Sequence, residues 1–234
     1  MKTTSEKLQG HIDPIWLSKL KPFLDSSKMD NILSFLTIKK NAGKVIFPAQ
    51  KNMFNAFKYT PFDDVKVVIL GQDPYPSLGL ADGLAFSSNI PTVCPASLRN
   101  ILKEVEEDVC NGLSLERTST YSLESWAKQG VLLLNTALTV EANSAGSHIL
   151  LWNDFTVNVL KILSKEKDNL IFLLWGKQAN FFKLYIDSTK HYILESAHPS
   201  PLARGAKNNF SGCKHFSKTN LILTEKLQKE PIHW

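Results

Sequence analysis

The sequence predicts an α/β fold: a single domain with a central, four-stranded, mainly parallel sheet flanked by helices. Three observations support this. Four short apolar runs are each followed by a loop rich in Gly, Pro or Asn, which is typical of buried strands. Segments with helical spacing separate these runs, which favours parallel pairing. A length of 234 residues is enough for one well-buried core. We expect one domain over residues 1–234, with a helical portion at about 1–60 and a sheet core at about 61–234.

The expected strands are residues 65–70, 131–134, 170–175 and 192–197. The loops that follow them are residues 71–75, 135–137, 176–179 and 198–202. Parallel strands bring their carboxyl ends to one edge of the sheet, where open α/β folds bind ligands. An acid, an amide and an imidazole are therefore expected to meet in one cleft.

Apolar stripes at helical spacing predict the remaining elements. The expected helices cover residues 16–23, 32–36, 97–109, 153–163, 178–186 and 216–227, with Ser97 opening the third of them. We interpret these stripes as core-facing.

Composition limits the class of protein. Hydrophobic residues make up 43% of the chain, which indicates a globular protein, and no apolar stretch is long enough to span a bilayer. No apolar segment follows the first residues, so we expect no secretory signal. The three cysteines have no CxxC spacing, which favours free thiols in a reducing compartment. We expect a protein of the bacterial cytoplasm or of a viral host cell, without a membrane.

Charge adds a hint about the partner. The formal net charge is +5, and residues 196–224 contain no acid but include Arg204, Lys207, Lys214 and Lys218. This basic stretch would suit contact with a phosphate backbone. A basic face that is simply exposed to solvent explains the charge equally well. Cys213 and His215 are possible metal ligands, but no second pair accompanies them. We expect no metal and no cofactor.

The loop after the first expected strand reads GQDPYPSLGLADGLAFS. Gly71 permits a sharp exit from the strand, and Pro74 holds Asp73 on a stiff, extended turn. Tyr75 and Phe86 supply ring faces. An ordinary Asp-Pro turn with two buried rings is the alternative interpretation.

The amide and imidazole loops also allow two interpretations. Asn135 offers one acceptor and two donors to a base edge, or it forms a simple Asx turn. His198 can donate a hydrogen bond to developing negative charge, and the prolines around Ser200 and Leu202 stiffen the loop. A satisfied histidine before a rigid turn is the alternative. Ser97 and the loop at Gly176 suit phosphate contacts or plain structural turns.

Taken together, these motifs resemble the uracil-DNA glycosylases of the family 1 type. The resemblance runs from about Phe47 onward. It includes the motifs GQDPY, GLAFS, PASL, LLLNTALTV, NSAGSH, LLWG, AHPSPL and GCKHFSKTN, in that order. The resemblance implies a monofunctional enzyme that flips deoxyuridine out of DNA, hydrolyses the N-glycosidic bond and leaves an abasic site, as in base excision repair.

The same resemblance implies roles for individual residues. Asp73 would orient the attacking water and stabilise the cationic sugar, and His198 would bind uracil O2. Asn135 would read N3 and O4, Phe86 would stack on the base, and Tyr75 would occupy the space of a thymine methyl group. The backbone at Gln72 would help to hold O2, and Leu202 would fill the hole left in the duplex. Phosphate contacts are expected at Ser97, Gly176, Lys177, Ser200 and Ser211. The implied partners are single- and double-stranded DNA that contains uracil, and a DNA-mimic inhibitor protein, with the enzyme acting as a monomer.

Four segments depart from the family pattern. Pro76-Ser77 replace a common His-Gly, the proline-rich loop is diluted at residues 91–95, Lys177 replaces a small serine, and residues 203–209 differ. We expect altered affinity or salt response with the chemistry retained. Three rival functions remain: a non-catalytic DNA-binding subunit, a glycosylase with a wider base range, and a nucleotide-binding enzyme. Neither a GxxxxGK[ST] loop nor an acidic metal cluster supports the last of these.

Overall fold

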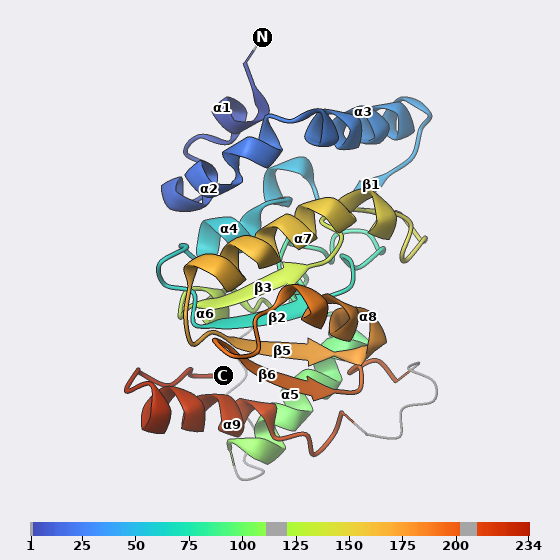
Figure 1. Cartoon of the computed structure of the whole chain (residues 1–234). Coiled ribbons are helices and arrows are strands. Elements are labelled where there is room, and N and C mark those ends of the chain that lie inside the picture. The colour runs from blue at the N-terminus through green and yellow to red at the C-terminus, as the bar shows by residue number, and fades with distance from the viewer. Residues whose placement is uncertain (1, 111–120, 202–209) are drawn as a thin grey trace.

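The computed structural model describes residues 2–110, 121–201 and 210–234 (Figure 1). Its strands are β1 (Ile46–Phe47), β2 (Val67–Gly71), β3 (Val131–Asn135), β4 (Val140–Glu141), β5 (Ile171–Trp175) and β6 (Tyr192–Ser196). Its α-helices are α1 (Thr4–Leu8), α2 (Pro14–Leu24), α3 (Ser27–Asn41), α4 (Asn55–Tyr59), α5 (Ala96–Asp108), α6 (Glu124–Ala127), α7 (Ile149–Glu166), α8 (Gly176–Phe181) and α9 (His215–Leu221). Short 3-10 turns η1 (Gln50–Asn52) and η2 (Phe182–Tyr185) and a π-helical turn η3 (Ile222–Lys226) complete the described elements.

The central sheet has the order β3-β2-β5-β6, and all of its pairings are parallel. This confirms the predicted four-stranded sheet, with strand ends shifted by one or two residues. Every residue of β2, β3 and β5 is buried, as their unbroken apolar runs predict. The prediction of a fully buried fourth strand is wrong: β6 is an edge strand whose residues are partly exposed, whereas the other edge strand, β3, is buried and contacts α4 and α6.

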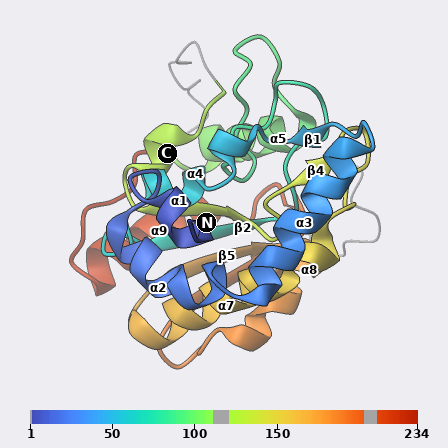
Figure 2. The ribbon, with the colours of Figure 1, turned by 90° about the horizontal axis from the view of Figure 1, so that it is seen from above.

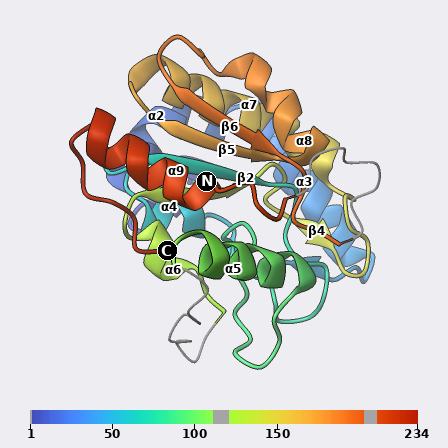
Figure 3. The same ribbon diagram turned by 90° about the horizontal axis from the view of Figure 1, so that it is seen from below.

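Helices cover both faces of the sheet. Viewed from above and from below, α7 lies on one face and α5 on the other (Figures 2 and 3). Helix α7 connects β3 to β5 and buries Trp152, Phe155, Val159 and Leu163. Helix α5 packs beside α9 and buries Leu98, Ile101 and Val105. The predicted apolar stripes are therefore core-facing, with Val109 exposed beyond the end of α5.

The N-terminal helices pack on the α7 side of the molecule. Phe23 of α2 contacts Phe155 of α7 edge-on, and Lys28 pairs with Asp154 at 2.6 Å. Trp16 is fully buried and its indole N–H donates to the Thr60 carbonyl oxygen at 2.9 Å. Strand β1 pairs antiparallel with β4 in a separate two-stranded sheet.

Two helices differ from the predicted ones in where they begin or end. Helix α5 begins at Ala96 after Pro95, so Ser97 lies inside its first turn and is not the N-cap. The helix predicted over 178–186 is instead a short α8 that tightens into η2. Within the described ranges, none of the helices has the length and apolar character needed to cross a membrane.

Candidate active site

The loops after β2 and β3 are tied together at the carboxyl edge of the sheet. Gly71 and Asn135 are register partners at the ends of these strands. Beyond them, the Thr136 backbone N–H donates to the Gly71 carbonyl oxygen and the Ala137 N–H donates to that of Gln72, both at 2.9 Å. These bonds place the acid and amide loops side by side, as the strand-end argument predicts.

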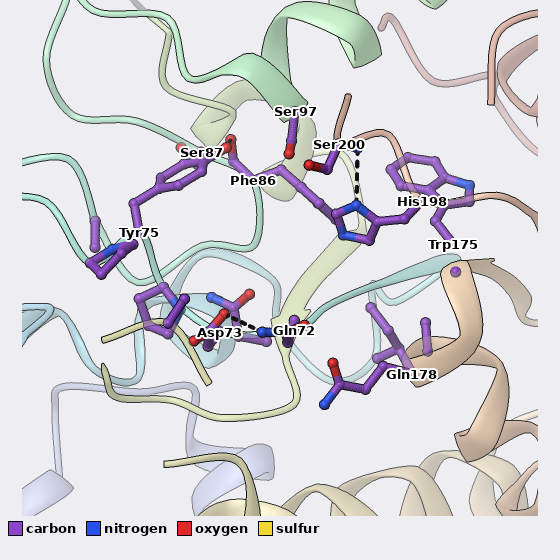
Figure 4. A pocket seen from close by; sticks show the side chains of 18 of the residues that line it. Gln72, Asp73, Tyr75, Phe86, Ser87, Ser97, Trp175, Gln178, His198 and Ser200 are labelled. Atoms are coloured by element: carbon purple, nitrogen blue, oxygen red, sulfur yellow. Dashed lines mark hydrogen bonds between the residues drawn. The ribbon is translucent and has the colours of Figure 1, made fainter. Parts of the chain in front are cut away.

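A pocket of about 610 Å³ opens at this edge (Figure 4). It is lined by Leu70, Gln72, Asp73, Pro74, Tyr75, Pro76, Ala81, Leu84, Phe86, Ser87, Ser97, Asn135, Ala145, Trp175, Gly176, Lys177, Gln178, Ala179, His198 and Ser200. Residues from all four predicted loops therefore share one cavity. Its volume is in the range of pockets that bind small molecules.

Asn135 presents an unpartnered polar atom in this pocket. Its side chain is 4% exposed, and its Oδ1 atom makes no hydrogen bond with any described residue. A buried acceptor without a partner is costly, and sites that bind polar ligands keep such groups for the ligand. Gly71 has the ordinary conformation of a strand, and its lack of a side chain serves a different purpose: a Cβ atom there would lie 2.4 Å from Asn135 Oδ1.

Asp73 is held by donors from two other residues. Its carboxylate accepts the Gly146 backbone N–H at 2.5 Å and the Gln72 side-chain amide at 3.0 Å. Burial raises the pKa of Asp73 above its usual 3.8, and these two hydrogen bonds oppose that rise. The NSAGSH segment thus has a positional role that its sequence does not reveal, since Gly146 contributes only a backbone group.

His198 has a defined tautomer. The Ser200 backbone N–H donates to Nδ1 of His198 at 3.0 Å, so in the neutral ring the proton is on Nε2. Burial lowers the pKa of His198 below its usual 6.5. The ring is therefore a neutral donor at neutral pH. Its ring centroid lies 5.9 Å from that of Phe86.

Phe86 is held in an uncommon backbone conformation. Its φ is +63°, in the left-handed region that most side chains avoid. The Tyr75 hydroxyl donates to the Phe86 carbonyl oxygen at 3.0 Å, and the next residue, Ser87, donates to the buried Asp82 carboxylate. These bonds fix both rings on one wall of the pocket, and burial raises the pKa of the Tyr75 hydroxyl.

Trp175 forms part of the pocket wall and was not predicted from the sequence. Its ring lies 5.5 Å from that of Phe86, and its indole N–H donates to Nδ1 of the buried His215 at 3.0 Å. Burial lowers the pKa of His215 to about 4, so this histidine accepts the bond in its neutral form. An aromatic residue at the carboxyl end of a strand is a signal that could have found Trp175. Gln178, which also lines the pocket, has no such signal.

The predicted phosphate-contacting residues lie in two places. Ser97, Gly176, Lys177 and Ser200 line the pocket, whereas Ser211 lines a neighbouring hollow beside α5. Leu202 and residues 203–209 lie outside the described residues. Within the parts of the chain that the structure describes, no cluster of three or more His, Cys, Asp or Glu could hold a metal ion. His215 was considered above as a possible metal ligand. Its Nδ1 atom accepts a hydrogen bond from the Trp175 indole N–H.

Comparison with known proteins assigns the family. The model of the uracil DNA glycosylase superfamily matches residues 57–224, which include every strand of the central sheet. The chain belongs to the uracil-DNA glycosylase superfamily. Among its relatives, the uracil-DNA glycosylase of Campylobacter curvus is 49% identical over 95% of this chain and 93% of its own. That of Serratia proteamaculans is 44% identical over 98% of this chain and 96% of its own.

Solved structures of the superfamily have the same fold. The crystal structure of mimivirus uracil-DNA glycosylase matches with a TM-score of 0.85 and 30% identity, over 97% of this chain and 88% of its own. A variant of that mimivirus protein, solved in complex with UGI, matches with a TM-score of 0.85 and 29% identity over 100% of this chain and 95% of its own. The likeness covers the N-terminal helices as well as the sheet.

Proposed function

We propose that this protein is a uracil-DNA glycosylase of the family 1 type, which hydrolyses the N-glycosidic bond of deoxyuridine in DNA and releases free uracil. The observation that carries the proposal is the buried, unpartnered Oδ1 atom of Asn135, in a pocket that also holds a carboxylate and a neutral imidazole. The likeness to relatives with this activity over nearly the whole chain supports it.

The Asn135 carboxamide suits the Watson–Crick edge of uracil. Its Oδ1 would accept from N3–H, and its amide would donate to O4. Phe86 would stack on the base from one side. The backbone N–H groups at Gln72 and Asp73, on the loop that leaves β2, would help to hold O2. Reading a base in this way requires that it leave the helix, as in other enzymes that act on bases.

Two opposite charges develop as the bond breaks, and the pocket has a group for each. The sugar becomes a cation, which the ionised Asp73 would stabilise while it orients the attacking water. Uracil leaves as an anion, and the Nε2–H of His198 would donate to its O2 atom. Donors fixed before the reaction stabilise such charge at little reorganisation cost. A base that departs as a stabilised anion needs no general acid. Because the reaction transfers no phosphoryl group and no electron, we expect it to need no metal or cofactor.

Tyr75 would exclude thymine. Its hydroxyl is anchored to the Phe86 carbonyl, so the ring cannot swing away without losing that bond. A methyl group at C5 would collide with the ring, which argues against a wider base range. The presence of Asp73, Asn135 and His198 in one pocket argues against a non-catalytic DNA-binding subunit.

DNA would approach the rim of the pocket through its phosphates. Ser97, Gly176, Lys177 and Ser200 would contact the backbone there, with Ser211 beside them and Leu202 filling the space of the extruded base. Pro76 would stiffen the Tyr75 wall, where many relatives carry a histidine. Unstacking costs roughly a few kcal/mol, which these contacts would offset.

We also infer that the chain acts as one domain and as a monomer in the cytoplasm of a bacterium or in a virus-infected cell. Contacts between α2 and α7 support one domain. The solved complex of a mimivirus relative with UGI supports binding of an inhibitor protein, and we infer that a DNA-mimic inhibitor would bind this chain. Addition of UGI to the assay below should abolish base release.

The test is release of free uracil from duplex and single-stranded oligonucleotides that carry one uracil, in the presence of EDTA. Matched duplexes with thymine or cytosine at that position serve as controls. Uracil release with an alkali-labile site only at uracil supports the proposal. Tight duplex binding without base release would favour the non-catalytic DNA-binding subunit, and loss of activity in EDTA would favour the nucleotide-binding enzyme.

A further inference from the structure

One face of helix α5 contacts two other segments of the proposed DNA-binding surface. These segments carry Ser200 and Ser211. Ser97, Asn100, Glu104 and Asp108 are spaced three or four residues apart, so they lie on one side of this helix. Ser97 lines the pocket from the first turn of α5. The other three side chains bind segments about a hundred residues further along the chain.

Asn100 holds the loop that carries His198 and Ser200. Its side-chain amide donates to the Pro199 carbonyl oxygen at 2.7 Å. Pro199 is buried and lies between the proposed uracil-binding histidine and a proposed phosphate-binding serine. A shift of this carbonyl would therefore move both groups relative to Ser97.

Glu104 and Asp108 hold the segment that carries Ser211. Glu104 is 2% exposed, and its two carboxylate oxygens accept the backbone N–H groups of Gly212 at 2.6 Å and of Lys214 at 2.9 Å. Asp108 accepts from the backbone and side chain of Ser217, at 2.8 and 2.6 Å. Lys214 has a φ of +55°, in the left-handed region that is costly for a residue other than glycine, so this turn depends on the bonds that hold it.

The two segments border a shared hollow next to α5. This hollow, of about 310 Å³, is lined by Asn100, Lys103 and Glu104, by the His198 loop, and by Phe210 and Ser211. The bonds to α5 therefore help to set the separation of these segments, together with the packing of the Phe210 ring against that of Trp175 at 5.0 Å.

We propose that Asn100 and Glu104 are positioning residues, which fix the spacing of the segments that carry Ser97, Ser200 and Ser211 so that the three contact the DNA backbone as one rigid unit. Three phosphate contacts require three matching distances, and small displacements of binding groups are costly to a reaction. The proposal rests on the proposed function, because it assigns a purpose to contacts made with DNA.

The main test is the substitution Glu104→Gln, which keeps the size of the side chain but presents an amide to one of the two backbone N–H groups. We expect KM for a uracil duplex to rise at least about tenfold, while inhibition by free uracil, which reaches only the pocket, changes less than about twofold. The matched control is Glu107→Gln, on the same helix, whose exposed carboxylate pairs with the exposed Lys103 at 3.7 Å. This control should behave like the unmodified protein.

Asn100→Leu provides a second test that keeps side-chain size and removes the donor. It should raise KM at least about tenfold and also lower kcat, because Pro199 adjoins His198. Each variant is assayed at the same interval below its own melting temperature, which separates positioning from stability. Unchanged KM in both variants, even with lowered melting temperatures, would overturn the proposal, as would equal losses of DNA and free-uracil binding in Glu104→Gln.

Failure of the proposed function is distinguishable from failure of this inference. If the unmodified protein binds the duplex but releases no uracil, the proposed function fails. The dissociation constant for the duplex then replaces KM. A rise of at least about tenfold in Glu104→Gln and Asn100→Leu, but not in Glu107→Gln, would still support the positioning role, and equal constants would overturn it.

Discussion

The floor and the rim of the pocket are built in different ways. The floor consists of Gly71, Asp73 and Asn135, which lie at or beside the ends of β2 and β3 and are tied by inter-strand bonds. The rim consists of Ser97, Lys177 and Ser200, which come from helix starts and a loop. Under the proposed function, the sheet would fix the chemistry, whereas α5 and its side chains would fix the grip on DNA.

Among substitutions that leave the charged groups in place, the largest effect should come from filling the floor, with Gly71→Ala. The added methyl group would lie 2.4 Å from Asn135 Oδ1 and 2.9 Å from the Ala85 Cβ atom, so the amide must move. We expect uracil release to fall about 10²-fold and the free energy of unfolding to fall by about 1–3 kcal/mol. Single-turnover rates and chemical denaturation measure the two effects.

Gly43→Ala is the control for that substitution. Nothing lies within 4 Å of a Cβ atom at Gly43, but its φ is positive at +80°, unlike that of Gly71, so a side chain there strains the backbone without touching a neighbour. A modest loss of stability with full activity is expected. Full activity in Gly71→Ala would mean that the floor is not rigid.

A second prediction concerns the wall beside the floor. Tyr75→Ala removes the ring that would meet the C5 methyl group, so we expect measurable thymine release from a thymine duplex. Tyr75→Phe keeps the ring but loses the 3.0 Å bond to the Phe86 carbonyl. It should release no thymine, and its uracil release should fall only about fivefold, as expected for one hydrogen bond of about 1 kcal/mol. Thymine release by both variants would assign the exclusion to another group.

The pH dependence of the rate tests the protonation states assigned to Asp73 and His198. The proposed active form has Asp73 ionised and His198 neutral. The pKa of Asp73 is raised above 3.8 and that of His198 is lowered below 6.5. His198 is therefore neutral at neutral pH, and single-turnover rates should fall as the pH drops, with Asp73 taking up its proton at a higher pH than an exposed aspartate does.

His198→Gln separates the two groups, because glutamine can donate but does not titrate. The pH profile of this slower variant should retain only the fall at low pH that comes from protonation of Asp73. A rate that falls with rising pH near neutrality would contradict the assigned protonation states.

The smallest effect is expected at the rim. Lys177→Ala removes one exposed cation from the edge of the pocket. If Lys177 contacts one phosphate, the slope of log K against log salt concentration for duplex binding should decrease by about 0.9. Lys165→Ala, an exposed lysine on α7, is the control and should leave the slope unchanged. An unchanged slope in Lys177→Ala would show that this side chain points to solvent.

The parts of the site that follow strand ends could be predicted from the sequence. Asp73, Asn135 and His198 follow apolar runs, and parallel pairing brings such positions to one edge. The sheet order and the exposure of β6 could not be predicted, because an edge strand with three apolar residues in its first half resembles a buried one. Likewise, the apolar residues Phe181 and Phe182 continue a helical pattern past the point where α8 tightens into η2.

The contacts that support the site were less predictable. Gly146 acts through its backbone, and Glu104 acts on a segment more than a hundred residues away. Neither interaction has a local pattern, since both depend on how distant segments pack. Gly71 was predicted for a sharp turn, yet the structure gives it an ordinary strand conformation and a different reason, the space for Asn135.

The most direct test of the account is a single-turnover comparison of Asp73→Asn with Asp168→Asn on a uracil duplex, with duplex binding measured in parallel. Asp168 is an exposed carboxylate that pairs with Lys190 at 2.9 Å, so its substitution matches the loss of charge. The account predicts a loss of about 10²–10³-fold in the rate of uracil release for Asp73→Asn, with duplex binding retained and Asp168→Asn unaffected. Equal rates in the two variants would contradict the claim that Asp73 stabilises the charge formed when the glycosidic bond breaks.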